Sequence, residues 1–163
     1  KLELDPIEKA LDLTHKKDVD KVKIIQFQKG KLDKPKQFRS IESLLENISV
    51  KDLGCKPADV RIIFSGNNVF PYDAREQWTD SCNLLAIKEG VVLGYDRNDK
   101  TLDAFHEAGF KSVKVEDLIA DFESGKVNPD DMEDTIILMP SSELSRARGG
   151  FHCMSMPLWR DEA

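Results

Sequence analysis

The chain has 163 residues, of which 40% are hydrophobic and 33% are charged, and its formal net charge is -6. This length and apolar content suit one globular domain, or part of a larger one. The acidic balance disfavours nucleic acid as a partner, and no apolar run is long enough to span a bilayer. Three irregularly spaced cysteines argue against a disulfide framework and indicate a cytoplasmic protein.

The first third of the chain predicts two helices and a strand. Residues 5–11 have the Asp-Pro start and apolar spacing of a helix. A β-rich run, Val22–Phe27, predicts a strand, and the lysine-rich Gly30–Lys36 predicts a solvated loop. Ser40 is suited to cap a helix over Ile41–Ile48, whose apolar residues form one stripe that we expect to pack on a sheet.

The middle of the chain predicts strands joined by short turns. Val60–Phe64 has the composition of a strand, and it ends at Ser65–Asn68, a turn sequence. Leu84–Ile87 and Val91–Leu93 are separated by a short loop with glycine at its end, so an antiparallel hairpin is expected.

A helix and a strand should follow this hairpin. Asp99 is suited to cap a helix whose apolar face holds Leu102 and Phe105, and Gly109 is placed to end it. A strand at Ser112–Val115 then closes a strand-strand-helix-strand unit.

The last third predicts one more helix and one more strand. Glu116–Glu123 has the pattern of a short helix, and a polar stretch follows it. Thr135–Met139 has the composition of a buried strand, stopped by Pro140, and Ser141 is suited to cap a turn of helix. The fold class that these elements indicate is mixed α/β.

A cysteine near the end of the chain stands in a setting that suits chemistry. Cys153 follows Arg148, the pair Gly149 and Gly150, and His152. A cysteine reacts as its thiolate, which nearby positive charge or N–H groups stabilise, and glycine lets the backbone approach a ligand closely. An arginine supplies a planar donor fork suited to a carboxylate. From these residues alone, a nucleophilic Cys153 and a buried structural Cys153 both remain open.

The other two cysteines have no such neighbours. Cys55 and Cys82 are accompanied by neither a glycine pair nor a histidine, so we expect packing or incidental roles for both.

Three segments, taken in order, resemble the arginine deiminase family. They are Arg75–Asp80 (REQWTD), Gly90–Asn98 (GVVLGYDRN) and Arg148–Pro157 (RGGFHCMSMP). The last is the most specific, because related guanidine-modifying enzymes share the glycine-rich turn, whereas Met-Ser-Met-Pro is similar to the deiminase of free arginine. The resemblance covers residues 59–119 and 143–162 well, and only the general layout before them.

The resemblance implies a role for each residue of the last segment. Cys153 matches the nucleophile that attacks the guanidinium carbon of L-arginine, expels ammonia and leaves a thiouronium-type intermediate, which water converts to L-citrulline. Arg148 matches a residue that holds the substrate carboxylate, with Gly149, Gly150 and His152 beside it in the substrate site. For His152 a structural or electrostatic role stays open. We expect no metal and no cofactor.

Residues of the other two segments are expected to have supporting roles. Trp78 belongs to the core or to the wall of the pocket rather than to the direct ligands. Asp96 and Arg97 are interpreted as a structural turn, because Asp and Asn after a strand commonly fix loops.

The family architecture is a five-bladed α/β propeller of ββαβ units, of which residues 1–163 would supply about two blades as the C-terminal portion of a single catalytic domain. Residues about 120–140 look like an insertion; a lid, an interface and a surface excursion are the alternatives, of which the surface excursion is the default expectation. The family's His-x-Asp pair, which serves as general acid and base, has no counterpart here. The three histidines and the residues two positions after them are His15 and Lys17, His106 and Ala108, and His152 and Met154.

Several expectations follow from that difference. The N-terminal portion of the domain should be absent, and the fragment alone should be inactive. A piece of two blades also exposes apolar faces, so it should form a homo-oligomer or associate with the missing half. An agmatine deiminase, an amidinotransferase relative and a non-catalytic binding or assembly module of the same fold remain the alternatives.

Overall fold

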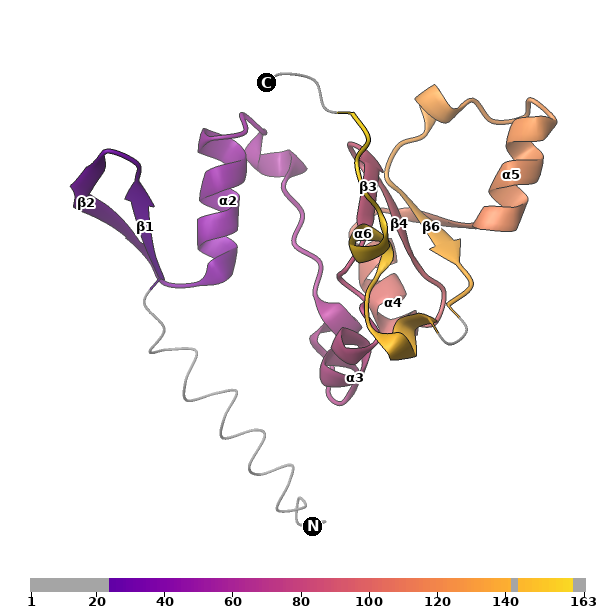
Figure 1. The fold of residues 1–163 in the computed structure, drawn as a ribbon, viewed down its shortest axis with the longest axis horizontal. Helices are drawn as coiled ribbons and strands as arrows, with labels where there is room; N and C mark the ends of the chain where they lie inside the picture. Colours follow the sequence, from indigo (N-terminus) through magenta and orange to yellow (C-terminus); the bar gives the residue numbers. More distant parts are fainter. Residues whose placement is uncertain (1–23, 142–143, 160–163) are drawn as a thin grey trace, which may run out of the picture. The chain divides into compact units, whose positions relative to one another are not determined.

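The computed structural model of the chain describes residues 24–141 and 144–159, which fall into two compact units divided after Ile62 (Figure 1). The helix expected at residues 5–11 and the residue His15 lie outside these ranges. None of the helices within the described ranges combines the length and the apolar character needed to cross a membrane.

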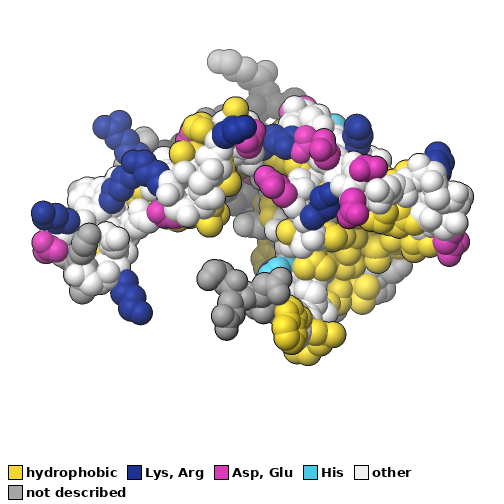
Figure 2. Space-filling view, turned by 90° about the horizontal axis from the view of Figure 1, so that it is seen from above, with side chains coloured by type: hydrophobic (Ala, Val, Ile, Leu, Met, Phe, Trp, Pro, Cys, Tyr) yellow, Lys and Arg dark blue, Asp and Glu magenta, His cyan; other side chains and the backbone are white. Residues whose placement is uncertain are grey.

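The first unit begins with an antiparallel ribbon of β1 (Ile24–Gln28) and β2 (Lys31–Phe38). The predicted strand at Val22–Phe27 is confirmed over its described residues, but the loop predicted at Gly30–Lys36 is wrong, because most of it belongs to β2. The described side chains of β2 are exposed or half-buried. A strand that faces solvent can be as polar in composition as a loop, which is why the sequence indicated a loop here. Lysine and arginine side chains project from this unit in the space-filling view (Figure 2).

Helix α2 (Ile41–Lys51) follows and has the predicted cap. Ser40 Oγ accepts from the backbone N–H of Ser43 at 3.2 Å, and Ser43 Oγ accepts from that of Ser40 at 3.3 Å, which is a capping box. The helix contacts β2, as predicted, but its apolar stripe is not fully buried there. Ile41 and Leu45 are 61% and 49% exposed, and no described residue of this unit is fully buried.

The stretch that joins the two units is extended but belongs to no sheet of the described ranges. After a short 3₁₀ helix, η2 (Pro57–Asp59), the predicted strand Val60–Phe64 is wrong, because this stretch is in no sheet of the described ranges. Its ends do have extended dihedral angles, with φ and ψ of -84° and 110° at Val60 and -94° and 141° at Phe64. The residue types of this stretch therefore favour an extended backbone even though it joins no sheet.

The second unit opens with a tight turn and a helix. The turn predicted at Ser65–Asn68 is present as the 3₁₀ segment η3, in which Gly66 has φ +58°. It leads into α3 (Tyr72–Trp78).

A four-stranded sheet forms the centre of this unit, in the order β3-β4-β6-β5 (Figure 1). Its strands are β3 (Leu85–Lys88), β4 (Val91–Tyr95), β5 (Lys111–Lys114) and β6 (Thr135–Met139). The predicted hairpin is confirmed as the antiparallel pair β3 and β4, and the predicted buried strand is confirmed as β6, which is parallel to both of its neighbours.

The helices of this unit connect the parallel strands. Helix α4 (Asp99–Glu107) joins β4 to β5, and α5 (Val115–Glu123) with the 3₁₀ turn η4 (Pro129–Asp131) joins β5 to β6. Asp99 is the first residue of its helix and Asn98 precedes it as the cap, one position earlier than predicted.

The position of β6 bears on two expectations. The predicted order strand, strand, helix, strand is confirmed along the chain as β3, β4, α4 and β5, and in the sheet β6 lies between β4 and β5. The segment about 120–140 is not a surface excursion throughout, because it ends in this central strand.

The core lies between the sheet and α5. Val91 of β4, Leu118 of α5 and Ile137 of β6 are buried in one cluster. Leu93 and Val113 flank Ile137 in register on the two neighbouring strands and pack against that cluster. The alternation along three strands thus supplies one continuous apolar face for α5.

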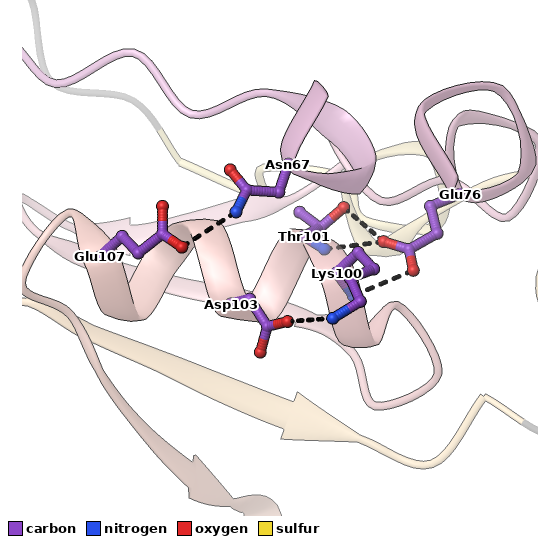
Figure 3. Close-up of polar contacts among 6 residues, drawn as sticks. All are labelled: Asn67, Glu76, Lys100, Thr101, Asp103 and Glu107. Atoms are coloured by element: carbon purple, nitrogen blue, oxygen red, sulfur yellow. Dashed lines mark hydrogen bonds and ion pairs between the residues drawn. The ribbon is translucent and has the colours of Figure 1, made fainter. Parts of the chain in front are cut away.

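A buried glutamate joins α3 to the start of α4 (Figure 3). Glu76 is 1% exposed, and its carboxylate accepts hydrogen bonds from the backbone N–H groups of Lys100 at 3.0 Å and Thr101 at 2.7 Å. The hydroxyl of Thr101 donates to it at 2.8 Å. A carboxylate at a helix N-terminus satisfies donors that have no partner within the helix. The contact fixes α3, and with it Trp78 and the turn that follows.

Candidate active site

The predicted nucleophile lies on a short helix after an irregular turn. Helix η5 (Leu144–Ala147) is followed by Arg148, Gly149 and Gly150, and then by α6 (Phe151–Met154), which carries Cys153. The side chain of Cys153 is free and exposed, which excludes the buried structural thiol.

Three consecutive residues at the end of β4 hold the segment that leads to this turn. The hydroxyl of Tyr95 donates to the carbonyl of Gly149 at 3.1 Å. Asp96 Oδ1 accepts from the backbone N–H of Ser141 at 3.2 Å, and Arg97 Nη1 donates to the buried hydroxyl of Ser145 at 2.7 Å. The structural interpretation of Asp96 and Arg97 agrees with these contacts.

Asn83 is the closest polar partner that the structure gives the thiol. Its Nδ2 donates to Cys153 Sγ at 2.8 Å. An N–H donor at the sulfur stabilises negative charge there. Asn83 precedes β3 and falls between two of the segments that carry the family resemblance, so sequence reasoning missed it.

Glycine is required at the two positions of this turn for different structural reasons. Gly149 has φ +106°, and its N–H donates to Asp80 Oδ2 at 3.0 Å. Gly150 has an extended φ of -85°, but a Cβ atom there would lie 2.2 Å from the carbonyl oxygen of Asn83. The first glycine therefore provides a backbone conformation and the second provides room.

Arg148 extends over the ring of Trp78. Its guanidinium carbon lies 4.1 Å from the ring centroid, within the range of a cation–π contact. Together with Gln77 these side chains line a cavity of about 290 Å³. Cys153 does not line this cavity.

His152 and the remaining cysteines lie outside these contacts. His152 is exposed, and its backbone carbonyl accepts from the hydroxyl of Ser155 at 3.0 Å. Cys55 is half-buried and Cys82 is exposed, and both are free. Within the described ranges, no three His, Cys, Asp or Glu side chains come together as a metal site.

The electrostatics of the turn favour a neutral Tyr95. Burial raises the pKa of its hydroxyl above the ordinary value, and the negative charges of Asp80 and of an ionised Cys153 raise that pKa further. Tyr95 therefore stays protonated at neutral pH and is able to donate to Gly149.

This arrangement suits nucleophilic chemistry on a small substrate. An exposed sulfur with an amide donor is able to attack an electrophilic carbon, and Arg148, on the same turn, is able to bind an anionic group.

Comparison with known proteins gives one consistent result. The model of the family described as arginine deiminase matches residues 14–160. An arginine deiminase of Mycoplasma capricolum subsp. capricolum is 36% identical over 104 residues, which are 64% of this chain and 20% of the relative. Those of Borrelia duttonii and Borrelia recurrentis are 38% and 37% identical over 126 residues, 77% of this chain and 24% of each relative. The chain thus spans between 20% and 24% of the length of these relatives.

Proposed function

The chain belongs to the arginine deiminase family, and from this premise we propose that the protein that contains it hydrolyses L-arginine to L-citrulline and ammonia. The observation that carries the proposal is the exposed thiol of Cys153, which accepts a hydrogen bond from Asn83 on a glycine-rich turn.

In the proposed reaction Cys153 acts twice. Its thiolate attacks the guanidinium carbon, a C–S bond forms, and a C–N bond breaks as ammonia leaves with a proton. Water then attacks the same carbon of the thiouronium intermediate, the C–S bond breaks, and citrulline and the thiolate are released. This route replaces one difficult hydrolysis with two easier steps.

The acid and base for this reaction are assigned by the resemblance to a His-x-Asp pair. None of the three histidines of this chain has an aspartate two positions after it. The proton transfers are therefore proposed for the protein that contains the chain, and the isolated 163 residues are expected to be inactive.

Arg148 is proposed to bind the carboxylate of arginine. Its side chain is exposed, carries a permanent positive charge and is held at the wall of a cavity by Trp78. Gly149, Gly150 and His152 are proposed to lie beside the substrate. A substrate without a carboxylate would not use Arg148, so turnover of agmatine in place of arginine would indicate the agmatine deiminase alternative.

The central test is the replacement Cys153→Ser in the protein that contains this chain. We expect citrulline production to fall by about 10³-fold or more, because a serine hydroxyl is far less ionised than a thiol near neutral pH. Cys82→Ser is the matched control, since Cys82 is also exposed and free but lies outside the turn, and it should keep full activity. Retention of activity by Cys153→Ser would exclude the nucleophile.

The remaining expectations also stay predictions. The resemblance implies a five-bladed propeller of ββαβ units, and the irregularly spaced cysteines indicate a cytoplasmic location. Exposed apolar faces favour a homo-oligomer or association with the other half of the domain.

A further inference from the structure

Gly149 is held at both of its backbone polar groups by side chains from distant parts of the chain. Its N–H donates to Asp80 Oδ2 at 3.0 Å, and its carbonyl accepts from Tyr95 Oη at 3.1 Å. Asp80 follows α3, whereas Tyr95 is the last residue of β4. We call Asp80 and Tyr95 the Gly149 clamp.

The clamp acts on a stretch of backbone that does not maintain its conformation by itself. Arg148 has φ +67° and Gly149 has φ +106°, so two successive residues lie in the left-handed region. An arginine seldom adopts this conformation without support from its surroundings. The two hydrogen bonds on Gly149 provide such support directly next to Arg148.

Tyr95 also contacts the chain on the other side of the turn. Its ring is 4% exposed and lies 4.5 Å from the ring of Phe151, centroid to centroid. Phe151 begins α6, two residues before Cys153. One buried side chain thus contacts the backbone just after Arg148 and the helix that carries the thiol.

Each residue of the Gly149 clamp is supported by secondary structure of the second unit. Asp80 follows α3, which the buried carboxylate of Glu76 joins to α4. Tyr95 is anchored in β4, whose neighbour β6 is the other interior strand of the sheet. The turn is therefore held by hydrogen bonds from two separate parts of the second unit, the residues after α3 and the end of β4.

We propose that Asp80 and Tyr95 are positioning residues, which fix the backbone of Arg148 and Gly149 and so set the distance and direction between the Arg148 guanidinium and the Cys153 sulfur. This role rests on the proposed function, in which one group binds the carboxylate of the substrate and the other attacks its guanidinium carbon. A displacement of about 1 Å between such groups costs on the order of 100-fold in rate.

The test compares two tyrosine variants of the protein that contains this chain. Tyr95→Phe removes the hydroxyl but keeps the ring on Phe151, and Tyr72→Phe makes the same change at the other tyrosine of the chain. We expect Tyr95→Phe to lower kcat for arginine by about 10- to 100-fold per folded molecule, with Tyr72→Phe unchanged. A loss of thermal stability with an unchanged kcat would overturn the proposal.

Asp80 supplies a second, independent pair of variants. Asp80→Ala removes the acceptor and should lower kcat as Tyr95→Phe does, whereas Asp80→Asn keeps an oxygen that accepts from the Gly149 N–H and should restore most of the rate. Equal kcat values for Asp80→Ala and the unmodified protein would contradict the clamp. This pair also decides the question if Tyr95→Phe does not fold.

A measurement without arginine separates the clamp from the proposed function. The rate of iodoacetamide alkylation is followed on the Cys153 peptide by mass spectrometry, with the Cys82 peptide as internal control. We expect Tyr95→Phe and Asp80→Ala to slow alkylation of Cys153 several-fold, because Sγ loses its alignment with the Asn83 donor. If the unmodified protein fails to hydrolyse arginine, the proposed function is wrong, while this comparison still tests the clamp. Equal alkylation rates in all variants would contradict it.

Discussion

Neighbouring residues of the same type serve different purposes in this turn. Gly149 and Gly150 form one motif in the sequence, but the first has a positive φ and the second faces a carbonyl oxygen that leaves no room for a Cβ atom. The sequence predicted that both permit a tight approach, which general glycine chemistry implies. It did not reveal Asn83, because the contact between Asn83 and Cys153 joins residues 70 positions apart.

The same distinction gives a prediction at two other glycines. Gly66 and Gly125 have φ of +58° and +69°, but a Cβ atom at Gly66 would lie 2.2 Å from backbone atoms of Tyr72 and Asp73, whereas at Gly125 nothing lies within 4 Å. We expect Gly125→Ala to lower the free energy of unfolding by about 1 kcal/mol, which is the cost of the left-handed conformation. Gly66→Ala should lower it by about 3 kcal/mol or more, because the backbone must also move.

Urea denaturation of the chain and its two variants measures both values. Equal losses for Gly66→Ala and Gly125→Ala would show that the backbone overlap at Gly66 has no energetic weight.

At the scale of elements, composition predicted the strands and helices wherever burial and alternation agree. β6 and α5 were recovered almost to the residue, because their apolar residues face a core. β2 was missed because its described side chains are solvated, and the strand expected at Val60–Phe64 is absent because that stretch joins no sheet within the described ranges. Strand formation requires pairing as well as propensity.

The contact between α3 and α4 gives a prediction at this scale. Glu76→Gln replaces one acceptor oxygen with an amide group that is unable to accept from Lys100 or Thr101, and it removes the negative charge at the N-terminus of α4 (Figure 3). We expect a loss of about 2 kcal/mol in the free energy of unfolding.

Glu107→Gln is the matched control for this substitution. Glu107 is exposed at the other end of the same helix, and the amide oxygen of glutamine would still accept from Asn67. This variant should leave the urea midpoint almost unchanged, and an equal shift for both variants would contradict the capping role of Glu76.

At the scale of the whole molecule, the two units differ in how much they bury. The second unit has the cluster of Val91, Leu118 and Ile137, whereas no described residue of the first unit is fully buried. Uncovered apolar side chains are present on both units (Figure 2). A two-stranded ribbon without a buried face has little stability of its own.

Hydrogen exchange of the 163-residue chain measures this difference directly. We expect backbone amides of β6 to exchange on the order of 100-fold more slowly than those of β1, because β6 is paired on both sides and buried. Equal protection of β1 and β6 would show that the ribbon is stabilised as strongly as the sheet.

The sequence by itself determined the α/β class, most elements of the second unit, the family and the identity of the proposed nucleophile. These depend on local periodicity and on short motifs, which can be recognised in the sequence itself. Only the tertiary structure decided that β6 lies between β4 and β5 in the sheet. It alone also showed the hydrogen bond from Asn83 to Cys153 and the hydrogen bonds of Asp80 and Tyr95 with Gly149. Each of these is a contact between residues far apart in sequence, and burial and pairing, rather than local propensity, select such contacts.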